Sequence, residues 1–364
     1  MNLNEARETI REVDEQMAPL FVRRMEAVRE VAAYKKAHGL PVEDLEQEAR
    51  VIEGRSSLVT DDDIRPFYIR FLQDTMNVSK QWQQRLLDGM RVAYSGVEGA
   101  FAYMAAKRIF PNGTPVSHTS FEEAYEAVVS GSCDVAVLPI ENSYAGEVGQ
   151  VLDLMFAGSL YVNGVYDFPI VQNLMGMPDA HLEDVKTVIS HPQALAQCRN
   201  YIADRGLEEI GASNTAVAAQ EVAKRNDPSL AAIANDETAK LYGLKILDHD
   251  INESRTNTTR FAVFSRAENR STAEKDSDAF LLLFTVKDEA GGLAKALNVI
   301  SVYNFNMRVL RSRPMKDLPW HYYFYVEAEG NDASENGQRM ISALQGICPH
   351  VKVVGRYKTA TEML

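Results

Sequence analysis

The chain has 364 residues, which at roughly 100–200 residues per domain predicts two to four domains. Hydrophobic residues make up 46% and charged residues 24%, a composition typical of globular proteins, while the net charge of −13 argues against nucleic acid as a partner. The charged N-terminus does not resemble a signal peptide, and no apolar run approaches the roughly 20 residues of a membrane span. Three scattered cysteines make no disulfide framework. We therefore expect a cytoplasmic protein that binds neither nucleic acid nor membrane.

Residues 1–88 are predicted to be helical, with breaks at Gly39, Pro41 and Gly54–Ser57. Apolar residues of the first helix fall on one arc, but Arg24 and Lys35 lie within that arc, about 20° apart. Cations on a buried stripe are costly unless an anion meets them. Either acidic neighbours pair with them, or an anionic ligand does. Because two short helices cannot cover so long a stripe, we expect a homodimer or a higher homo-oligomer.

The middle of the chain, residues 91–265, alternates short apolar runs with amphipathic stretches. The runs RVAYSG, CDVAVLPI, TVISH and AAIAN are predicted strands, and the alternation predicts an α/β domain with largely parallel sheets. The polar segment Arg266–Ser277 is predicted to be a linker. A third domain follows over residues 278–364, where residues 279–357 have the order strand, helix, strand, strand, helix, strand. That order is typical of an α+β ferredoxin-like sandwich.

Polar residues follow several of the predicted strands in the middle domain. Pro139–Ser143 (PIENS) lies at the carboxyl end of one strand, where open α/β sheets bind ligands. Ser190–Gln193 (SHPQ) follows another, and a lone His191 there is more often a helix cap than a base. The glycine-rich turn Tyr94–Phe101 is a weak signal, since it matches neither a P-loop nor a dinucleotide fingerprint.

Residues 4–87 resemble the all-helical chorismate mutase family, an intertwined dimer whose sites contain residues of both subunits. The resemblance implies that Arg7 reaches the partner's site, that Arg24 holds a substrate carboxylate and that Lys35 and Gln83 bind the ether oxygen of chorismate. Fixed cations and donors would stabilise the negative charge that develops on this oxygen. The remaining matches, implied to bind substrate, are Asp44, Glu48 and Ser79.

One position departs from the mutase family. Gln47 stands where the family usually has an arginine, and a glutamine supplies no charge. An impaired mutase region therefore remains an alternative to an active one.

Residues 91–265 resemble prephenate dehydratase, on the strength of PIENS, SHPQ, YGLKIL and the string Thr258–Phe261 (TTRF). The resemblance implies two α/β lobes, similar to periplasmic binding proteins, with the site in the cleft between them. Thr259 would donate a proton to the leaving hydroxyl of prephenate, without a metal or cofactor, while Glu141 is predicted to be structural. The residues implied to orient the substrate are Asn142, Ser190, Gln197 and Arg260. Together the two resemblances imply a bifunctional enzyme, and a monofunctional dehydratase with an impaired mutase region is the alternative.

Residues 279–357 resemble an ACT domain, a module that binds amino acids at a dimer interface. Two strings carry the resemblance, GGLA and RSRP, where the family has Gly-Ala-Leu-Val and Glu-Ser-Arg-Pro. Phenylalanine is the effector that the pathway implies, although a domain that only holds the dimer together is an alternative, as is a non-catalytic amino-acid sensor for the whole chain. The implied effector residues are Gly291, Gly292, Leu293, Ala294, Arg311, Ser312, Arg313 and Pro314, of which Ala294 and Arg311 depart from the family pattern.

Overall fold

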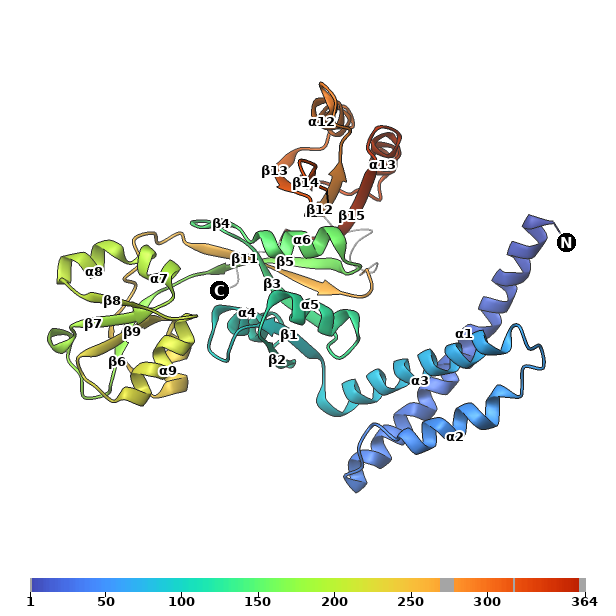
Figure 1. The fold of residues 1–364 in the computed structure, drawn as a ribbon, viewed down its shortest axis with the longest axis horizontal. Helices are drawn as coiled ribbons and strands as arrows, with labels where there is room; N and C mark the ends of the chain where they lie inside the picture. Colours follow the sequence, from blue (N-terminus) through green and yellow to red (C-terminus); the bar gives the residue numbers. More distant parts are fainter. Residues whose placement is uncertain (1, 269–277, 317, 360–364) are drawn as a thin grey trace. The chain divides into compact units, whose positions relative to one another are not determined.

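The computed structural model describes residues 2–268, 278–316 and 318–359. The chain forms two compact units, residues 1–91 and 92–364, each of which is considered by itself (Figure 1). Most of the predicted linker, residues 269–277, lies outside the described residues. No helix in the described part of the chain is both long and apolar enough to cross a membrane.

The first unit is helical, as predicted. A capping box between Asn2 and Glu5 starts the first helix, and Gly39 ends it with a left-handed φ of 64°. Gly54 lies within the second helix and does not break it, because the helix continues to Ser56. The three helices are α1 (Leu3–His38), α2 (Leu45–Ser56) and α3 (Arg65–Asp88).

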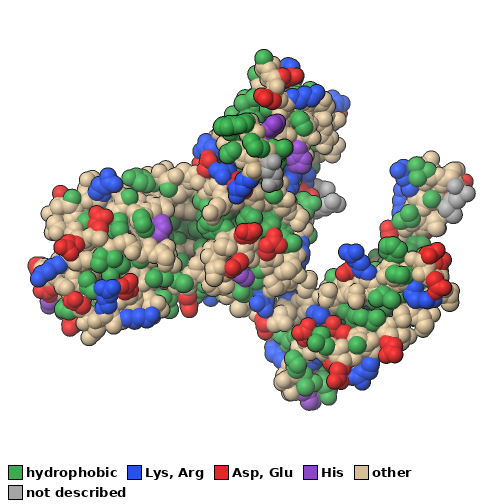
Figure 2. Space-filling model, in the orientation of Figure 1, with side chains coloured by type: hydrophobic (Ala, Val, Ile, Leu, Met, Phe, Trp, Pro, Cys, Tyr) green, Lys and Arg blue, Asp and Glu red, His purple; other side chains and the backbone are tan. Residues whose placement is uncertain are grey.

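This unit buries few hydrophobic side chains. Within residues 2–91, only Ala32 and Leu72 are buried hydrophobic residues. The predicted apolar arc of α1 is exposed in the single chain, with Ile10 61% and Leu20 64% accessible, and Figure 2 shows hydrophobic side chains on the surface of this unit. A core this small contributes little stability to the helical unit. The exposed apolar face of α1 is the kind of surface that a partner would cover.

The second unit begins with an α/β lobe, which we call the first lobe. Its sheet has the strand order β2-β1-β3-β11-β5, with β4 paired to β3. The strands are β1 (Arg91–Ser95), β2 (Thr114–His118), β3 (Val135–Asn142), β4 (Gly146–Glu147), β5 (Tyr161–Pro169) and β11 (Thr258–Ser265), and the helices are α4 (Phe101–Ile109), α5 (Phe121–Val129) and α6 (Gly149–Ala157).

A second sheet forms what we call the second lobe, with the strand order β10-β6-β9-β7-β8. Two chain segments cross between the lobes, residues 170–172 and 249–257, and the amide of Ile170 donates to the carbonyl of Asn257 at 2.8 Å. The elements are β6 (Asn173–Gly176), η1 (Leu182–Asp184), β7 (Thr187–Ser190), α7 (Pro192–Gln197), α8 (Arg199–Arg205), β8 (Glu208–Gly211), α9 (Thr215–Arg225), β9 (Leu230–Ala234), α10 (Asp236–Tyr242) and β10 (Lys245–Asp248).

The prediction of largely parallel sheets is wrong, although the four predicted strands form β1, β3, β7 and β9. β1 pairs parallel with β3, and β7 with β8 and β9. However, β11 returns from the second lobe and runs antiparallel to both β3 and β5, and β6 runs antiparallel to β9 and β10. A continuous apolar run indicates that a strand is buried on both faces of its sheet. The antiparallel strands here are buried in the same way as parallel ones, so the runs do not reveal strand direction.

The predicted element order of residues 279–357 is confirmed, in a four-stranded antiparallel sheet of order β13-β14-β12-β15. One face of this sheet shares a core with the first lobe, and the other packs against its own two helices. The close approach to β5 needs a glycine, since a Cβ at Gly355 would clash with the carbonyl oxygen of Val162. The elements are β12 (Ala279–Thr285), α12 (Gly292–Val302), β13 (Met307–Pro314), β14 (Tyr322–Glu329), α13 (Glu335–Ile347) and β15 (His350–Tyr357).

Candidate active sites

The structure brings Thr259 and Asn142 together. They face each other on the paired strands β11 and β3, and Asn142 Nδ2 donates to Thr259 Oγ1 at 2.9 Å. Both side chains are buried. Among the described residues this is the one hydrogen bond to the Thr259 hydroxyl, so its own proton is available to another acceptor. A hydrogen bond accepted by the oxygen also stabilises charge that develops there when the proton leaves.

The amide of Asn142 is held from both ends. Its Oδ1 accepts from the backbone amides of Tyr144 at 3.0 Å and Ala145 at 2.8 Å. Its Nδ2 also donates to Oδ1 of Asn257 at 3.0 Å. These contacts fix the orientation of the amide that faces Thr259.

The second lobe reaches this pair through a residue that the sequence analysis did not single out for a role. Gln193 Nε2, at the start of α7, lies 3.5 Å from Asn142 Oδ1. The predicted Ser190 and Gln197 are also buried, but they contact other groups: Ser190 donates to the carbonyl of Ile233 at 2.6 Å, and Gln197 accepts from the amide of Gln172 at 3.4 Å.

His191 is a helix cap, as predicted. Its Nδ1 accepts from the backbone amide of Gln193 at 3.2 Å at the N-terminus of α7. Burial lowers the pKa of the His191 imidazole, which favours the neutral form that can accept this bond.

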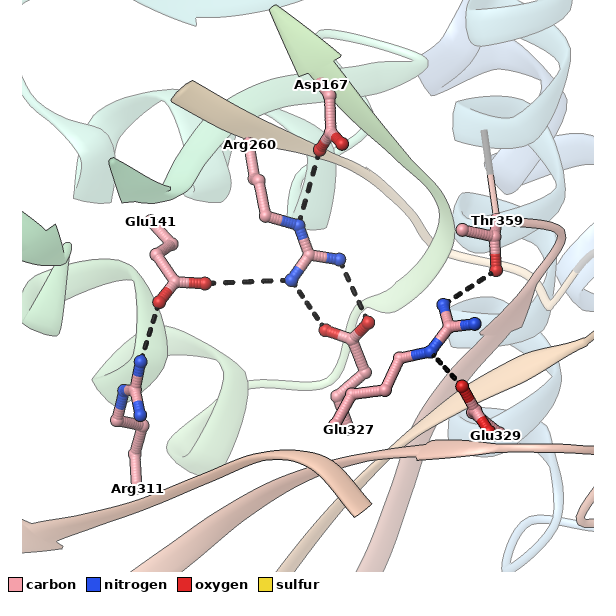
Figure 3. Close-up of polar contacts among 8 residues, drawn as sticks. Glu141, Asp167, Arg260, Arg311, Glu327, Glu329 and Thr359 are labelled. Atoms are coloured by element: carbon pink, nitrogen blue, oxygen red, sulfur yellow. Dashed lines mark hydrogen bonds and ion pairs between the residues drawn. The ribbon is translucent and has the colours of Figure 1, made fainter. Parts of the chain in front are cut away.

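Arg260 follows Thr259 on β11 but has different contacts. Successive side chains of a strand point to opposite faces, so the two neighbours on β11 diverge. The Arg260 guanidinium forms two hydrogen bonds with Glu327 of the C-terminal sheet, at 2.7 and 3.0 Å, and lies 3.6 Å from Glu141 and 3.4 Å from Asp167 (Figure 3). Three carboxylates therefore surround a cation that was expected to bind an anionic substrate.

Glu327 is the buried member of its ion pair with Arg260, with 2% of the Glu327 side chain and 21% of the Arg260 side chain accessible. Burial alone lowers the pKa of Arg260, but the hydrogen bonds and charge of Glu327 outweigh it and raise that pKa above its ordinary value. Arg311 joins the same cluster by donating to Glu141 at 2.7 Å (Figure 3). Glu141 thus has the structural contacts that the sequence analysis predicted for it.

In the helical unit, Arg24 joins α1 to α3. Its Nη1 donates to the hydroxyl of Ser79 and lies 3.4 Å from the carbonyl of Thr75. Burial lowers the pKa of Arg24, and the positive charge of Arg55 lowers it further by a smaller amount. Among the described residues, no carboxylate pairs with Arg24, so a half-buried cation beside a second cation is left for an anion from outside the chain.

The other predicted mutase residues have separate contacts. Lys35 Nζ donates to the carbonyl of Val42 at 2.6 Å, and Gln83 is buried with no partner for its Oε1 among the described residues. Glu48 pairs with Lys80 at 3.1 Å. Two remain at the surface: Asp44, which caps α2 through the amide of Gln47, and Arg7 on α1.

The predicted effector residues lie in two places in the C-terminal part of the chain, at the start of α12 and at the end of β13. Gly291 has a left-handed φ of 79° at the start of α12, and a Cβ at Gly292 would lie 2.6 Å from the carbonyl oxygen of Lys287. Leu293 is half-buried. Ala294 on α12 is exposed, and so are Ser312 and Pro314 on β13. Arg313 instead contacts the first lobe, with its Nε 3.0 Å from Asp153 Oδ1.

Besides Gln193, two further residues near the sites were not predicted. Asn257 lies two positions before Thr259, and the alternation of a strand would have placed both on one face. Glu327 gave no comparable signal, because an isolated glutamate in an apolar strand does not reveal its partner.

Comparison with known proteins assigns both units. A prephenate dehydratase family model matches residues 92–269, and a chorismate mutase type II model matches residues 6–84. A bifunctional chorismate mutase/prephenate dehydratase from Enterobacter agglomerans is 31% identical over 366 residues, covering 96% of this chain and 94% of that relative. An arogenate dehydratase/prephenate dehydratase 2 from Arabidopsis thaliana is 34% identical over 76% of this chain and 74% of its own length.

Among solved structures, prephenate dehydratase from Arthrobacter aurescens, in complex with L-Phe, superposes with a TM-score of 0.68 at 28% identity. The match covers 74% of this chain and 90% of that one. The helical and the α/β units thus each match a family of their own, and one relative spans both. The chain belongs to the family of bifunctional chorismate mutase/prephenate dehydratases.

Proposed function

We propose that the chain converts chorismate to prephenate in its helical unit and prephenate to phenylpyruvate in its α/β lobes, under inhibition by phenylalanine. The single observation that carries the dehydratase assignment is the bond from Asn142 to Thr259, which leaves the hydroxyl proton of Thr259 available. In the reaction the ring loses its carboxylate as carbon dioxide, the electron pair expels the hydroxyl group, and one proton converts that group to water. Thr259 supplies this proton and recovers one from solvent.

The mutase assignment rests on Arg24. This half-buried cation meets hydroxyl and carbonyl oxygens of the chain rather than a carboxylate, and an incoming substrate carboxylate supplies the missing charge. Lys35 and Gln83 bind the ether oxygen as the C–O bond breaks. Asp44, Glu48 and Ser79 complete the subsite.

We also propose that the mutase unit works as a homodimer. Its apolar α1 face is exposed in the single chain, and a second copy covers that face and contributes Arg7 to the site. The same apolar face is the reason why the sequence predicts a homodimer or a higher homo-oligomer.

For residues 278–364 we propose an ACT domain that binds phenylalanine. The element order and the glycine-led start of α12 fit that module, since a backbone without a Cβ lets an amino acid approach closely. Arg311 and Arg313 contact the first lobe, so this module has a direct connection to the dehydratase strands. Residues 1–88 and 91–265 form the mutase and dehydratase domains.

The test is to supply chorismate, prephenate and arogenate separately to the purified chain without added cofactor. We expect chorismate and prephenate each to yield phenylpyruvate, with prephenate preferred over arogenate because the mutase unit makes it. A sensor would turn over none of them, and a dehydratase with an impaired mutase would use prephenate only. The Lys35→Ala variant should lose about 10²-fold or more of the mutase rate and keep dehydration, whereas Lys36→Ala, at an exposed neighbour, should change neither.

A further inference from the structure

Asn257 carries a buried donor that the protein does not use. The residue lies at the end of the second crossing between the lobes, and 3% of its surface is accessible. Its Oδ1 accepts from Asn142, but its Nδ2 is buried and has no hydrogen-bond partner in the part of the chain that the structure describes. A buried amide donor without an acceptor is costly, so this N–H group requires an acceptor from outside the protein.

The position of this donor indicates what the acceptor is. Asn257 and Thr259 contact the same nitrogen of Asn142, at 3.0 and 2.9 Å, so the unused donor lies beside the hydroxyl proposed to protonate the leaving group. The backbone of Asn257 also binds Ile170 of the other crossing, and Gln193 approaches Asn142 from the second lobe. The donor therefore lies where both lobes meet the candidate site.

We infer that Asn257 is a substrate-binding residue of the dehydratase site, whose Nδ2 donates to a carboxylate or hydroxyl oxygen of the dianionic cyclohexadienyl substrate. Its Oδ1 has a second task, because it fixes the Asn142 amide that in turn holds Thr259. This inference rests on the proposed dehydratase function. It involves no covalent step, since Asn257 contributes only hydrogen bonds.

The two tasks can be separated with Asn257→Asp. This variant keeps an oxygen for Asn142 but replaces the donor with an anion that faces a dianion. We expect KM for prephenate to rise about 10-fold or more while kcat stays within about threefold, the pattern of lost substrate binding. Asn257→Ala removes both groups, so it should raise KM and also lower kcat.

Asn252→Asp is the matched control in the same crossing. Both ends of the Asn252 side-chain amide are already bonded within the protein. Its Oδ1 accepts from the backbone amide of Gln172 at 3.1 Å, and its Nδ2 donates to the backbone carbonyl of Ser254 at 2.6 Å. KM for prephenate should therefore stay within about twofold in that variant. For each variant, the mutase activity shows whether the helical unit is folded, and the melting temperature shows whether the two lobes are.

An unchanged KM in Asn257→Asp overturns the inference and indicates that a bound water satisfies the donor. An equal rise of KM in Asn252→Asp also overturns it, because the effect is then not specific to Asn257. If Asn257→Asp does not fold, Asn257→Ser removes the amide without adding charge; a KM that rises about 10-fold supports the inference, and an unchanged KM overturns it. Failure of the proposed function is a different result, in which the unmodified chain yields no phenylpyruvate from prephenate.

Discussion

Arg311 donates to Glu141 at 2.7 Å, and Glu141 directly precedes Asn142, the residue that holds the Thr259 hydroxyl. The proposed effector module therefore touches the reverse face of the strand pair whose other face carries the candidate site. Arg260 and Glu327 reinforce this connection (Figure 3).

Replacing Arg311 tests whether this contact transmits the effector signal. We expect Arg311→Gln to raise the phenylalanine concentration for half-inhibition about fivefold or more, since allosteric coupling is typically worth 1–3 kcal/mol. Arg308→Gln is the control, because Arg308 lies on the same strand but pairs with Glu329 at 2.6 Å within the C-terminal sheet. Equal shifts in both variants would contradict a specific role for Arg311.

Glu327 should matter for stability far more than its neighbour Glu329. Glu327→Leu removes the buried partner of the partly buried Arg260, which keeps only the longer contacts with Glu141 and Asp167. Breaking a fully buried pair costs about 3–5 kcal/mol, which is the upper limit for this change. Glu329→Leu removes an exposed pair, worth about 0–1 kcal/mol. Thermal unfolding of the two variants measures the difference, and similar melting temperatures would show that the buried pair does not stabilise the joint between the sheets.

The hydroxyl of Thr259 is expected to be essential for dehydration only. Thr259→Ala should lower the rate of phenylpyruvate formation about 10²–10⁴-fold, because positioned proton transfer is lost. Thr259→Ser retains the hydroxyl and should recover most of that rate. Both variants should convert chorismate to prephenate at the normal rate, and loss of the mutase reaction would mean that the two sites are not separate.

The exposed apolar face of α1 is expected to form the dimer. Leu20→Asp should dissociate the dimer, measured by sedimentation, and lower the mutase rate at the same time. Val22→Asp is the matched control, since Val22 is similarly exposed but lies about 160° away around the helix. A dimer that survives Leu20→Asp would contradict this interface.

Periodicity and motif spacing predicted the elements better than their directions and contacts. The helices, the apolar strands and the element order of the C-terminal sheet follow from local patterns. Strand direction does not, because apolar composition reports burial alone, and β11 proved antiparallel to both neighbours. Arg260 shows the same limit: the motif places it beside Thr259, while strand alternation and a distant glutamate hold it on the opposite face.

The most direct measurement is a structure of the chain with a dianionic cyclohexadienyl acid bound in both units. We expect a ligand carboxylate against Arg24, a contact between Lys35 and the ether oxygen of the ligand, and a hydroxyl group within hydrogen-bond distance of Thr259. Ligand bound elsewhere, with Arg24, Lys35 and Thr259 all facing solvent, would contradict it.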